Sequence, residues 1–128
     1  ALDRIHDLKV TETEPYRENT VFDPLTFFDD VVGVTKSLEQ KAHKVRFWAN
    51  PQNAPYIKTK PIHKSQTVIE EREDKSAVFE IEVVINNELQ RVFFGFADSI
   101  KVLSPPSLSE FMAWKFRMAK ELYNDEKI

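Results

Sequence analysis

The sequence predicts an α+β fold in which helices cover one face of an antiparallel sheet. Two observations carry this prediction. Strand-like alternation of apolar residues recurs between residues 44 and 103, and segments with helical spacing separate the alternating runs. A chain of 128 residues, 41% hydrophobic and 30% charged, can bury one continuous core and has the composition of a globular protein. We therefore expect one principal domain.

The first 22 residues predict little regular structure. Four apolar side chains between residues 2 and 10 fit neither the strand nor the helix period well, and we interpret residues 1–10 as a short strand that ends a preceding domain. Residues 11–22 contain three glutamates and Pro15 with little apolar content, which is typical of a linker. The principal domain is then expected to span residues 23–128.

A short N-terminal helix is predicted between Asp23 and Gly33. Asp23 is a good N-cap, Pro24 suits the first helical position, and Gly33 is a typical stop. Apolar residues at helical spacing between these limits favour a helix that packs inward, with Asp29 and Asp30 in water.

The next segments predict the first half of the sheet. Residues 44–49 alternate, with Val45, Phe47 and Ala49 on one face, which indicates a strand. A helix within residues 52–60 can be capped by either Asn50 or Asn53. Residues 66–72 and 77–85 then form a predicted hairpin around a polar turn.

The remaining elements complete the pattern. Asn86 or Asn87 caps a helix that ends near Gly95, and residues 100–103 form a last short strand before two prolines. Residues 107–110 have the spacing of a capping box, so the final helix is expected from there to about Tyr123. From residue 44 onward, the first six elements have the βαββαβ order of ferredoxin-like folds.

The final helix carries a mainly apolar stripe along one side. Trp114 and Phe116 lie off this stripe, and additional exposed aromatic residues can indicate a partner surface, although single exposed apolar residues are common. The stripe consists of Leu108, Phe111, Met112, Lys115, Met118, Ala119 and Leu122.

Charge and composition exclude several functions. A net charge of −3 disfavours a surface that binds duplex DNA by neutralising phosphates. The absence of Cys excludes disulfides, thiolate catalysis and cysteine-ligated zinc, and agrees with a cytoplasmic location. No apolar run is long enough to span a bilayer, so we expect no membrane contact.

No constellation in the sequence predicts an enzyme. The three histidines, His6, His43 and His63, do not have the spacing of a metal site, and two glycines are too few for a phosphate-binding loop. The acidic run at residues 70–74 is better explained as a solvated hairpin tip than as an acid and base pair. We therefore predict no catalytic residues, no metal and no cofactor.

One basic stretch is a candidate ligand site. Its lysines, imidazole and amide suit a phosphate or another anion, whereas the alternative is an exposed connector in which Gln66 hydrogen-bonds to the backbone. The candidate residues in this stretch are Lys58, Lys60, His63, Lys64 and Gln66.

Several separated pieces of the sequence resemble one known family. Residues 2–5 (LDRI) resemble the end of a WYL domain, and residues 28–34, 54–57, the Pro61-x-His63-x-Ser65-Gln66 piece and Gly95 followed by residues 102–106 (VLSPP) resemble the WCX extension that follows it. The resemblance covers nearly the whole chain, and it lies in the order and spacing of the pieces.

The resemblance implies the C-terminal regulatory part of a bacterial WYL-domain transcription regulator. Its expected partners are the remaining WYL and helix-turn-helix domains, a second copy in a homodimer, and a nucleic-acid or other anionic effector. The helix-turn-helix and the namesake WYL motif do not occur in the sequence, so we expect that this chain does not itself bind DNA. Arg4 matches an arginine in the closing strand of the WYL domain and joins the candidate ligand residues.

Two other functions remain open at the level of the sequence. A stand-alone single-stranded nucleic-acid binder would use Trp48, Tyr56 or Phe47 to stack on bases beside lysines. A small ferredoxin-like enzyme would use His63 with a nearby carboxylate as acid and base, although no nucleophile or metal set accompanies it.

Overall fold

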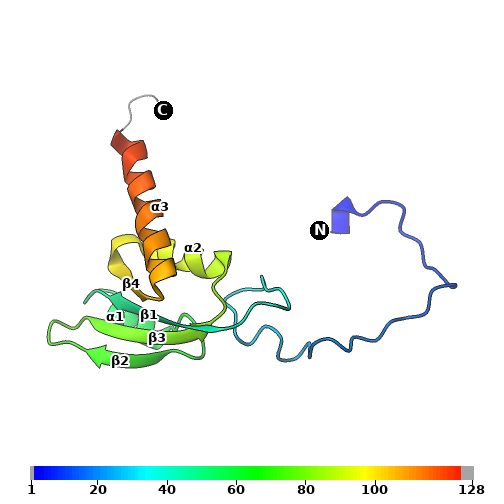
Figure 1. Ribbon diagram of the computed structural model, residues 1–128, viewed down its shortest axis with the longest axis horizontal. Coiled ribbons are helices and arrows are strands. Elements are labelled where there is room, and N and C mark those ends of the chain that lie inside the picture. Colours follow the sequence, from blue (N-terminus) through cyan, green and yellow to red (C-terminus); the bar gives the residue numbers. More distant parts are fainter. Residues whose placement is uncertain (1, 125–128) are drawn as a thin grey trace.

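The computed structural model describes residues 2–124 and contains a four-stranded sheet with three α-helices (Figure 1). From β1 to β4 the element order is βαββαβ, as predicted, and α3 follows it. Two 3-10 helices, η1 (Leu2–Arg4) and η2 (Ala97–Ser99), are short. The longer elements are β1 (His43–Ala49), α1 (Ala54–Thr59), β2 (Thr67–Glu71), β3 (Ala77–Val83), α2 (Asn87–Phe96), β4 (Ile100–Ser104) and α3 (Pro106–Asn124).

The sheet is antiparallel throughout and has the strand order β2-β3-β1-β4. β1 is an inner strand that pairs with β3 over its full length, from His43 opposite Val83 to Ala49 opposite Ala77. β2 is an edge strand whose five residues are all exposed, and its register against β3 shifts between Val68 and Glu70.

Helices α1 and α2 cover one face of the sheet and enclose the core. The predicted inward residues of β1 are fully buried, and the ring of Phe47 lies 5.4 Å from that of Phe79 and 5.3 Å from that of Phe93. Ile57 of α1 and Leu89 of α2 belong to the same cluster. Alternation in the strands and helical spacing in α2 therefore position the core as the sequence predicts.

The opposite face of the sheet is polar. Arg46 donates to the Glu80 carboxylate over 2.7 Å, between residues that oppose each other in the β1–β3 register. Trp48 is half-buried beside Val78 on this face. The alternation of β1 thus separates a core face from a charged face.

The predicted helix between Asp23 and Gly33 does not form, because residues 24–34 are turns and bends. Its carbonyl groups have other partners: Lys36 donates to the Phe27 carbonyl, and the Val84 amide donates to the Asp30 carbonyl. A helix of so few residues is marginal by itself. The segment keeps isolated turns, such as the bond from the Phe27 amide to the Asp23 carbonyl, while Lys36 and Val84 bind carbonyls that a continuous helix would use.

The predicted strand at residues 1–10 is also wrong for residues 2–10, which form η1 and irregular chain; residue 1 lies outside the described part. The N-terminal segment extends away from the folded domain (Figure 1). A strand requires a neighbour to accept and donate its backbone hydrogen bonds, and residues 2–10 have none of the described strands beside them.

Helix α3 begins at Pro106, slightly earlier than predicted. Pro106 occupies the first helical position, and the Ser109 hydroxyl donates to the Pro106 carbonyl, so residues 107–110 do not form the expected capping box. Leu108 and Met112 are buried against the core, whereas the later turns project beyond the sheet and α2 (Figure 1). No described helix is long and apolar enough to cross a membrane.

Candidate functional site

The candidate basic residues lie on a turn that leads from α1 into β2, and Gln66 holds this turn together. The Gln66 side chain accepts from the Ile62 amide over 3.0 Å and donates to the Ile57 carbonyl over 3.0 Å. Both bonds close the connection between α1 and β2. The side chain of Gln66 is therefore occupied by backbone contacts. This agrees with the interpretation of the stretch as a connector in which Gln66 hydrogen-bonds to the backbone.

Two of the candidate lysines lie at the end of α1. Lys58 forms an ion pair with Glu71 of β2, and the hydrogen bond and charge of Lys58 hold the pKa of Glu71 below its ordinary value. The ammonium of Lys60 lies 5.5 Å from the centre of the Tyr56 ring. Both side chains are exposed, so they present positive charge to solvent at this edge of the domain.

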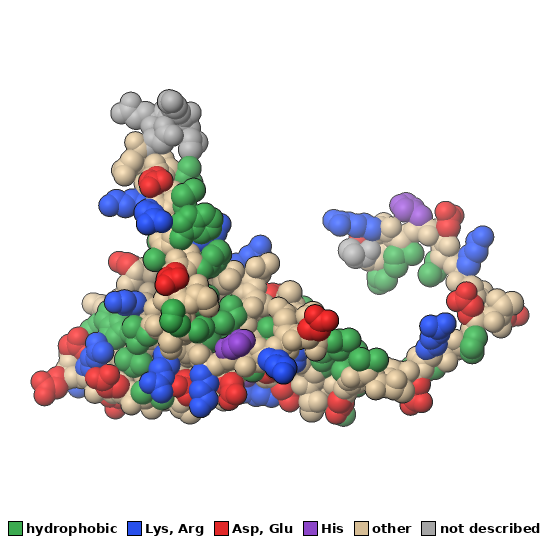
Figure 2. Space-filling view, in the orientation of Figure 1, with side chains coloured by type: hydrophobic (Ala, Val, Ile, Leu, Met, Phe, Trp, Pro, Cys, Tyr) green, Lys and Arg blue, Asp and Glu red, His purple; other side chains and the backbone are tan. Residues whose placement is uncertain are grey.

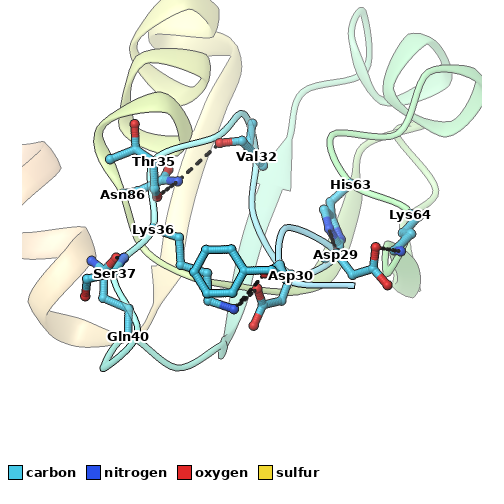
Figure 3. Close-up of polar contacts among 11 residues, drawn as sticks. Asp29, Asp30, Val32, Thr35, Lys36, Ser37, Gln40, His63, Lys64 and Asn86 are labelled. Atoms are coloured by element: carbon cyan, nitrogen blue, oxygen red, sulfur yellow. Dashed lines mark hydrogen bonds and ion pairs between the residues drawn. The ribbon is translucent and has the colours of Figure 1, made fainter. Parts of the chain in front are cut away.

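His63 and Lys64 contact the segment that precedes the sheet (Figure 3). The Ser65 amide donates to His63 Nδ1 over 3.1 Å, which leaves Nε2 to carry the proton and donate to the Asp29 carbonyl over 2.7 Å. Lys64 forms an ion pair of 3.1 Å with the Asp29 carboxylate. We name the connection at residues 58–66 the basic turn. A hydrogen bond from His63 and an ion pair from Lys64 therefore join this turn to Asp29.

Residues 27–36, which we name the clasp, are held on the domain by further contacts. The Val84 amide donates to the Asp30 carbonyl over 2.7 Å. Lys36 donates to the Asp30 carboxylate over 2.8 Å and to the Phe27 carbonyl over 2.9 Å, with its ammonium 4.7 Å from the Phe27 ring centre. These bonds fold the segment back on itself beside the end of β3.

The far end of the clasp is fixed at the start of α2. Asn86 caps this helix by accepting from the Leu89 amide, and its side-chain nitrogen donates to the carbonyls of Val32 and Thr35 over 3.2 and 3.0 Å (Figure 3). The Thr35 hydroxyl donates to Glu88, and this bond lowers the pKa of Glu88. Asn86 is buried, so one side chain satisfies a helix end and a clasp loop together.

Gly33 allows the clasp to approach α2 closely. Its φ is +81°, and a Cβ at this position would lie 2.8 Å from the Cγ of Glu88. Val31 is buried next to this turn. The glycine is therefore required for conformation and for space, rather than as the helix stop that the sequence predicts.

Arg4 is not brought to the basic turn. It lies in η1, at the far end of the extended N-terminal segment (Figure 1). Of the six candidate ligand residues, the structure places Lys58, Lys60, His63, Lys64 and Gln66 on one connection and Arg4 apart from them. Their use in ligand binding remains a prediction.

The described side chains offer charge and hydrogen bonds rather than a metal centre. Among residues 2–124, no three or more His, Asp or Glu side chains gather in a way that could hold a metal ion. Phe47 is fully buried and cannot stack on a base, which corrects one of the three aromatic candidates. Tyr56 is half exposed, beside Lys60.

Sequence reasoning missed the clasp, although some of its signals were present. Asp29 and Asp30 were expected in water on a helix surface. Asp29 is exposed as expected but also pairs with Lys64, whereas Asp30 is only partly exposed and pairs with Lys36 of the clasp itself. Asn86 was recognised as a helix cap, but its two bonds to residues 32 and 35 depend on tertiary contact. Gly33 was a local sign that the backbone of this segment approaches another element closely.

Comparison with known proteins identifies the folded part of the chain. The family model of the WCX domain matches residues 41–117, which is more than half of the chain and runs from just before β1 into α3. A search of curated proteins finds no match to the chain. The clasp lies outside the matched range, whereas its partners His63, Lys64, Val84 and Asn86 lie inside it. The chain belongs to the WCX domain family.

Proposed function

We propose that this chain is the C-terminal regulatory module of a bacterial WYL-domain transcription regulator, acting in the cytoplasm without catalysis and without binding promoter DNA itself. Membership of the WCX family supports this role. Its partners are then the WYL and helix-turn-helix domains of the same regulator.

The observation that carries the proposal is the double contact of Asp29 with His63 and Lys64. It joins the basic turn, which is the candidate effector surface, to the segment that leads from the preceding part of the chain. A change at the turn is thereby transmitted to that segment through named atoms. Such coupling between two regions is what a regulatory module requires.

The chemistry of the turn favours an anionic effector. Lys58 and Lys64 are each paired with one carboxylate in ion pairs that are largely exposed, and such pairs contribute little stability. A phosphate can therefore displace Glu71 or Asp29 at small cost and gain charge-assisted hydrogen bonds from the lysines. Displacing Asp29 loosens the clasp, so effector binding changes how the preceding segment is held.

A titration with short single-stranded DNA and RNA tests this proposal. Fluorescence anisotropy at about 50 mM and about 200 mM salt should show saturable binding that weakens at the higher salt, because lysines release counterions from phosphates. Lys60→Ala with Lys64→Ala should weaken binding, whereas Lys44→Ala on the other face of the sheet should not.

The Val84 amide reports the clasp in the same experiment. Its hydrogen bond goes to the Asp30 carbonyl, so its hydrogen exchange, followed by NMR, should accelerate when the effector binds. An absence of binding, or binding that leaves this exchange rate unchanged, would contradict the proposed coupling.

A further inference from the structure

Both ring nitrogens of His63 are engaged, and their partners belong to different parts of the domain. Nε2 donates to the carbonyl of Asp29 in the clasp over 2.7 Å (Figure 3). Nδ1 lies 3.1 Å from the amide nitrogen of Ser65 and 2.7 Å from its hydroxyl oxygen. The ring is only partly exposed. A change in the protonation of this ring therefore changes contacts with fixed partners.

The hydroxyl of Ser65 connects the ring to β3. Its oxygen accepts from the Glu82 amide over 2.8 Å and lies 3.3 Å from the Glu82 carbonyl. A hydroxyl has one proton and two acceptor positions, and it rotates to suit its partners. The Ser65 proton therefore has two acceptors within reach, which are Nδ1 of His63 and the carbonyl of Glu82.

In the neutral ring, Nδ1 carries a free electron pair and accepts from Ser65. The Ser65 amide donates to Nδ1, and the hydroxyl, which lies nearer, donates to it as well. The carbonyl of Asp29 then receives a hydrogen bond from an uncharged donor. Such a bond contributes only modestly to holding the clasp.

In the protonated ring, the same atoms bond with two roles exchanged. Nδ1 donates to the Ser65 oxygen, and the hydroxyl proton turns to the Glu82 carbonyl. The Ser65 amide loses its acceptor, but the bond from Nε2 to the Asp29 carbonyl gains a charged donor. Charge-assisted hydrogen bonds are roughly twice as strong as neutral ones. Protonation therefore strengthens the contact between the clasp and the basic turn.

The charged groups around the ring are compatible with an imidazolium. Asp29 brings its carboxylate as well as its carbonyl from the clasp, and Lys64 pairs with that carboxylate over 3.1 Å. From β3, Glu82 carries an exposed side chain beside the backbone groups that bind Ser65. An added positive charge on His63 thus meets two carboxylates and one ammonium.

The lysines of α1 have contacts of their own. Lys58 pairs with Glu71, and the ammonium of Lys60 lies over the ring of Tyr56. Figure 2 shows Lys and Arg side chains interleaved with Asp and Glu over the folded domain, rather than one large region of a single sign. Local contacts therefore decide the effect of the added proton.

We propose that His63 is a proton-sensitive latch of the clasp. Its imidazolium holds Asp29 more tightly than its neutral imidazole does, and rotation of the Ser65 hydroxyl permits both states. Histidine is the side chain that ordinarily changes charge between about pH 5 and pH 8. The clasp is then held more tightly at about pH 5.5 than at about pH 7.5. The inference goes beyond the proposed function, because the proton acts on the clasp without an anionic effector.

Hydrogen exchange of the Val84 amide, followed by NMR without any nucleic acid, tests the latch. This amide donates to the Asp30 carbonyl, next to the residue that His63 binds. Its protection factor, which is corrected for the intrinsic effect of pH on exchange, should be about fivefold larger at about pH 5.5 than at about pH 7.5. Long-range proton–nitrogen spectra should show a proton on Nε2 alone at the higher pH and on both ring nitrogens at the lower pH.

Three variants locate the response. His63→Gln keeps an uncharged donor for the Asp29 carbonyl, so it should remove the response while far-UV circular dichroism shows the same fold. Ser65→Ala removes the rotating hydroxyl and should reduce the response to less than about twofold. His43→Gln is the matched control, because His43 is exposed and lies opposite Val83, close to the reporting amide. It should leave the fivefold response unchanged.

A protection factor that is equal at the two pH values, or larger at the higher pH, would overturn the proposal, as would a ring that stays uncharged at about pH 5.5. A response that survives His63→Gln, or that disappears in His43→Gln, would assign the effect to another group. A response that survives Ser65→Ala would overturn the part of the hydroxyl. Failure here and failure to bind nucleic acid are separate results, because the pH experiment contains no effector.

Discussion

The amide of Val84, directly after β3, donates to the carbonyl of Asp30 over 2.7 Å. This bond connects the end of an inner strand to Asp30, which lies 13 residues before the start of β1 at His43. Asn86 continues the same connection two residues later. The clasp therefore depends on the β3–α2 junction. Substitutions at this junction should affect both the clasp and the start of α2.

Asn86→Ala is expected to destabilise the domain by roughly 1–3 kcal/mol. The substitution removes the cap on the Leu89 amide and leaves the carbonyls of Val32 and Thr35 without their donor. Urea unfolding followed by far-UV circular dichroism measures the free energy of unfolding. Asn87, the neighbouring exposed residue, gives the control. Asn87→Ala should change the free energy of unfolding by less than about 0.5 kcal/mol.

The two glycines should respond to alanine with opposite signs. Gly33→Ala places a side chain at φ +81° and against Glu88, so we expect a loss of about 1–2 kcal/mol and faster exchange of the Val84 amide. Gly95→Ala meets no atom within 4 Å in α2 and should stabilise the domain by about 0.5–1 kcal/mol. Equal effects at the two sites would contradict this account of Gly33.

Acid should release the Thr35 end of the clasp. The hydrogen bond from Thr35 lowers the pKa of Glu88 below its ordinary value of 4.5. The stabilisation is therefore fully present above about pH 4.5 and is lost as the pH falls through the lowered pKa. The Thr35 chemical shift should follow this transition in NMR spectra, and the transition should disappear in Glu88→Gln. A Thr35 titration that persists in that variant would show that another group causes it.

The aromatic cluster should dominate the stability of the core. Phe47 is fully buried between Phe79 and Phe93, so Phe47→Ala is expected to cost about 3–5 kcal/mol. The adjacent Trp48 is only half-buried on the opposite face, and Trp48→Ala should cost clearly less. Urea unfolding of both variants provides the comparison, and a larger loss at Trp48 would contradict the assignment of faces.

The sheet could be predicted from the sequence because its signals are local. Alternation in β1 placed Val45, Phe47 and Ala49 on one face, and all three are fully buried. Asn86 and the spacing of the following apolar residues located α2 to within a residue at each end. These patterns record which face of an element meets the core, so a single segment is sufficient to recognise them.

The clasp could not be predicted in this way, because its partners are distant in sequence. Asp23, Pro24 and Gly33 carry valid helix signals, yet three consecutive or near-consecutive carbonyls, at residues 27, 29 and 30, are bound by Lys36, His63 and Val84. Local propensity lost to tertiary hydrogen bonds, as it often does in short segments. The basic turn was located correctly, but the contact of His63 and Lys64 with Asp29 was not foreseen.

The central position of β1 has a consequence for synthesis of the chain. Both neighbours of β1 follow it in the sequence, and the nearer one, β3, begins 28 residues after β1 ends at Ala49. At roughly 5–20 residues per second, the ribosome leaves this strand with two open edges for about 1–6 seconds. Lys44 and Arg46 place charges at two alternate positions of the unpaired strand, where they oppose association with other nascent chains.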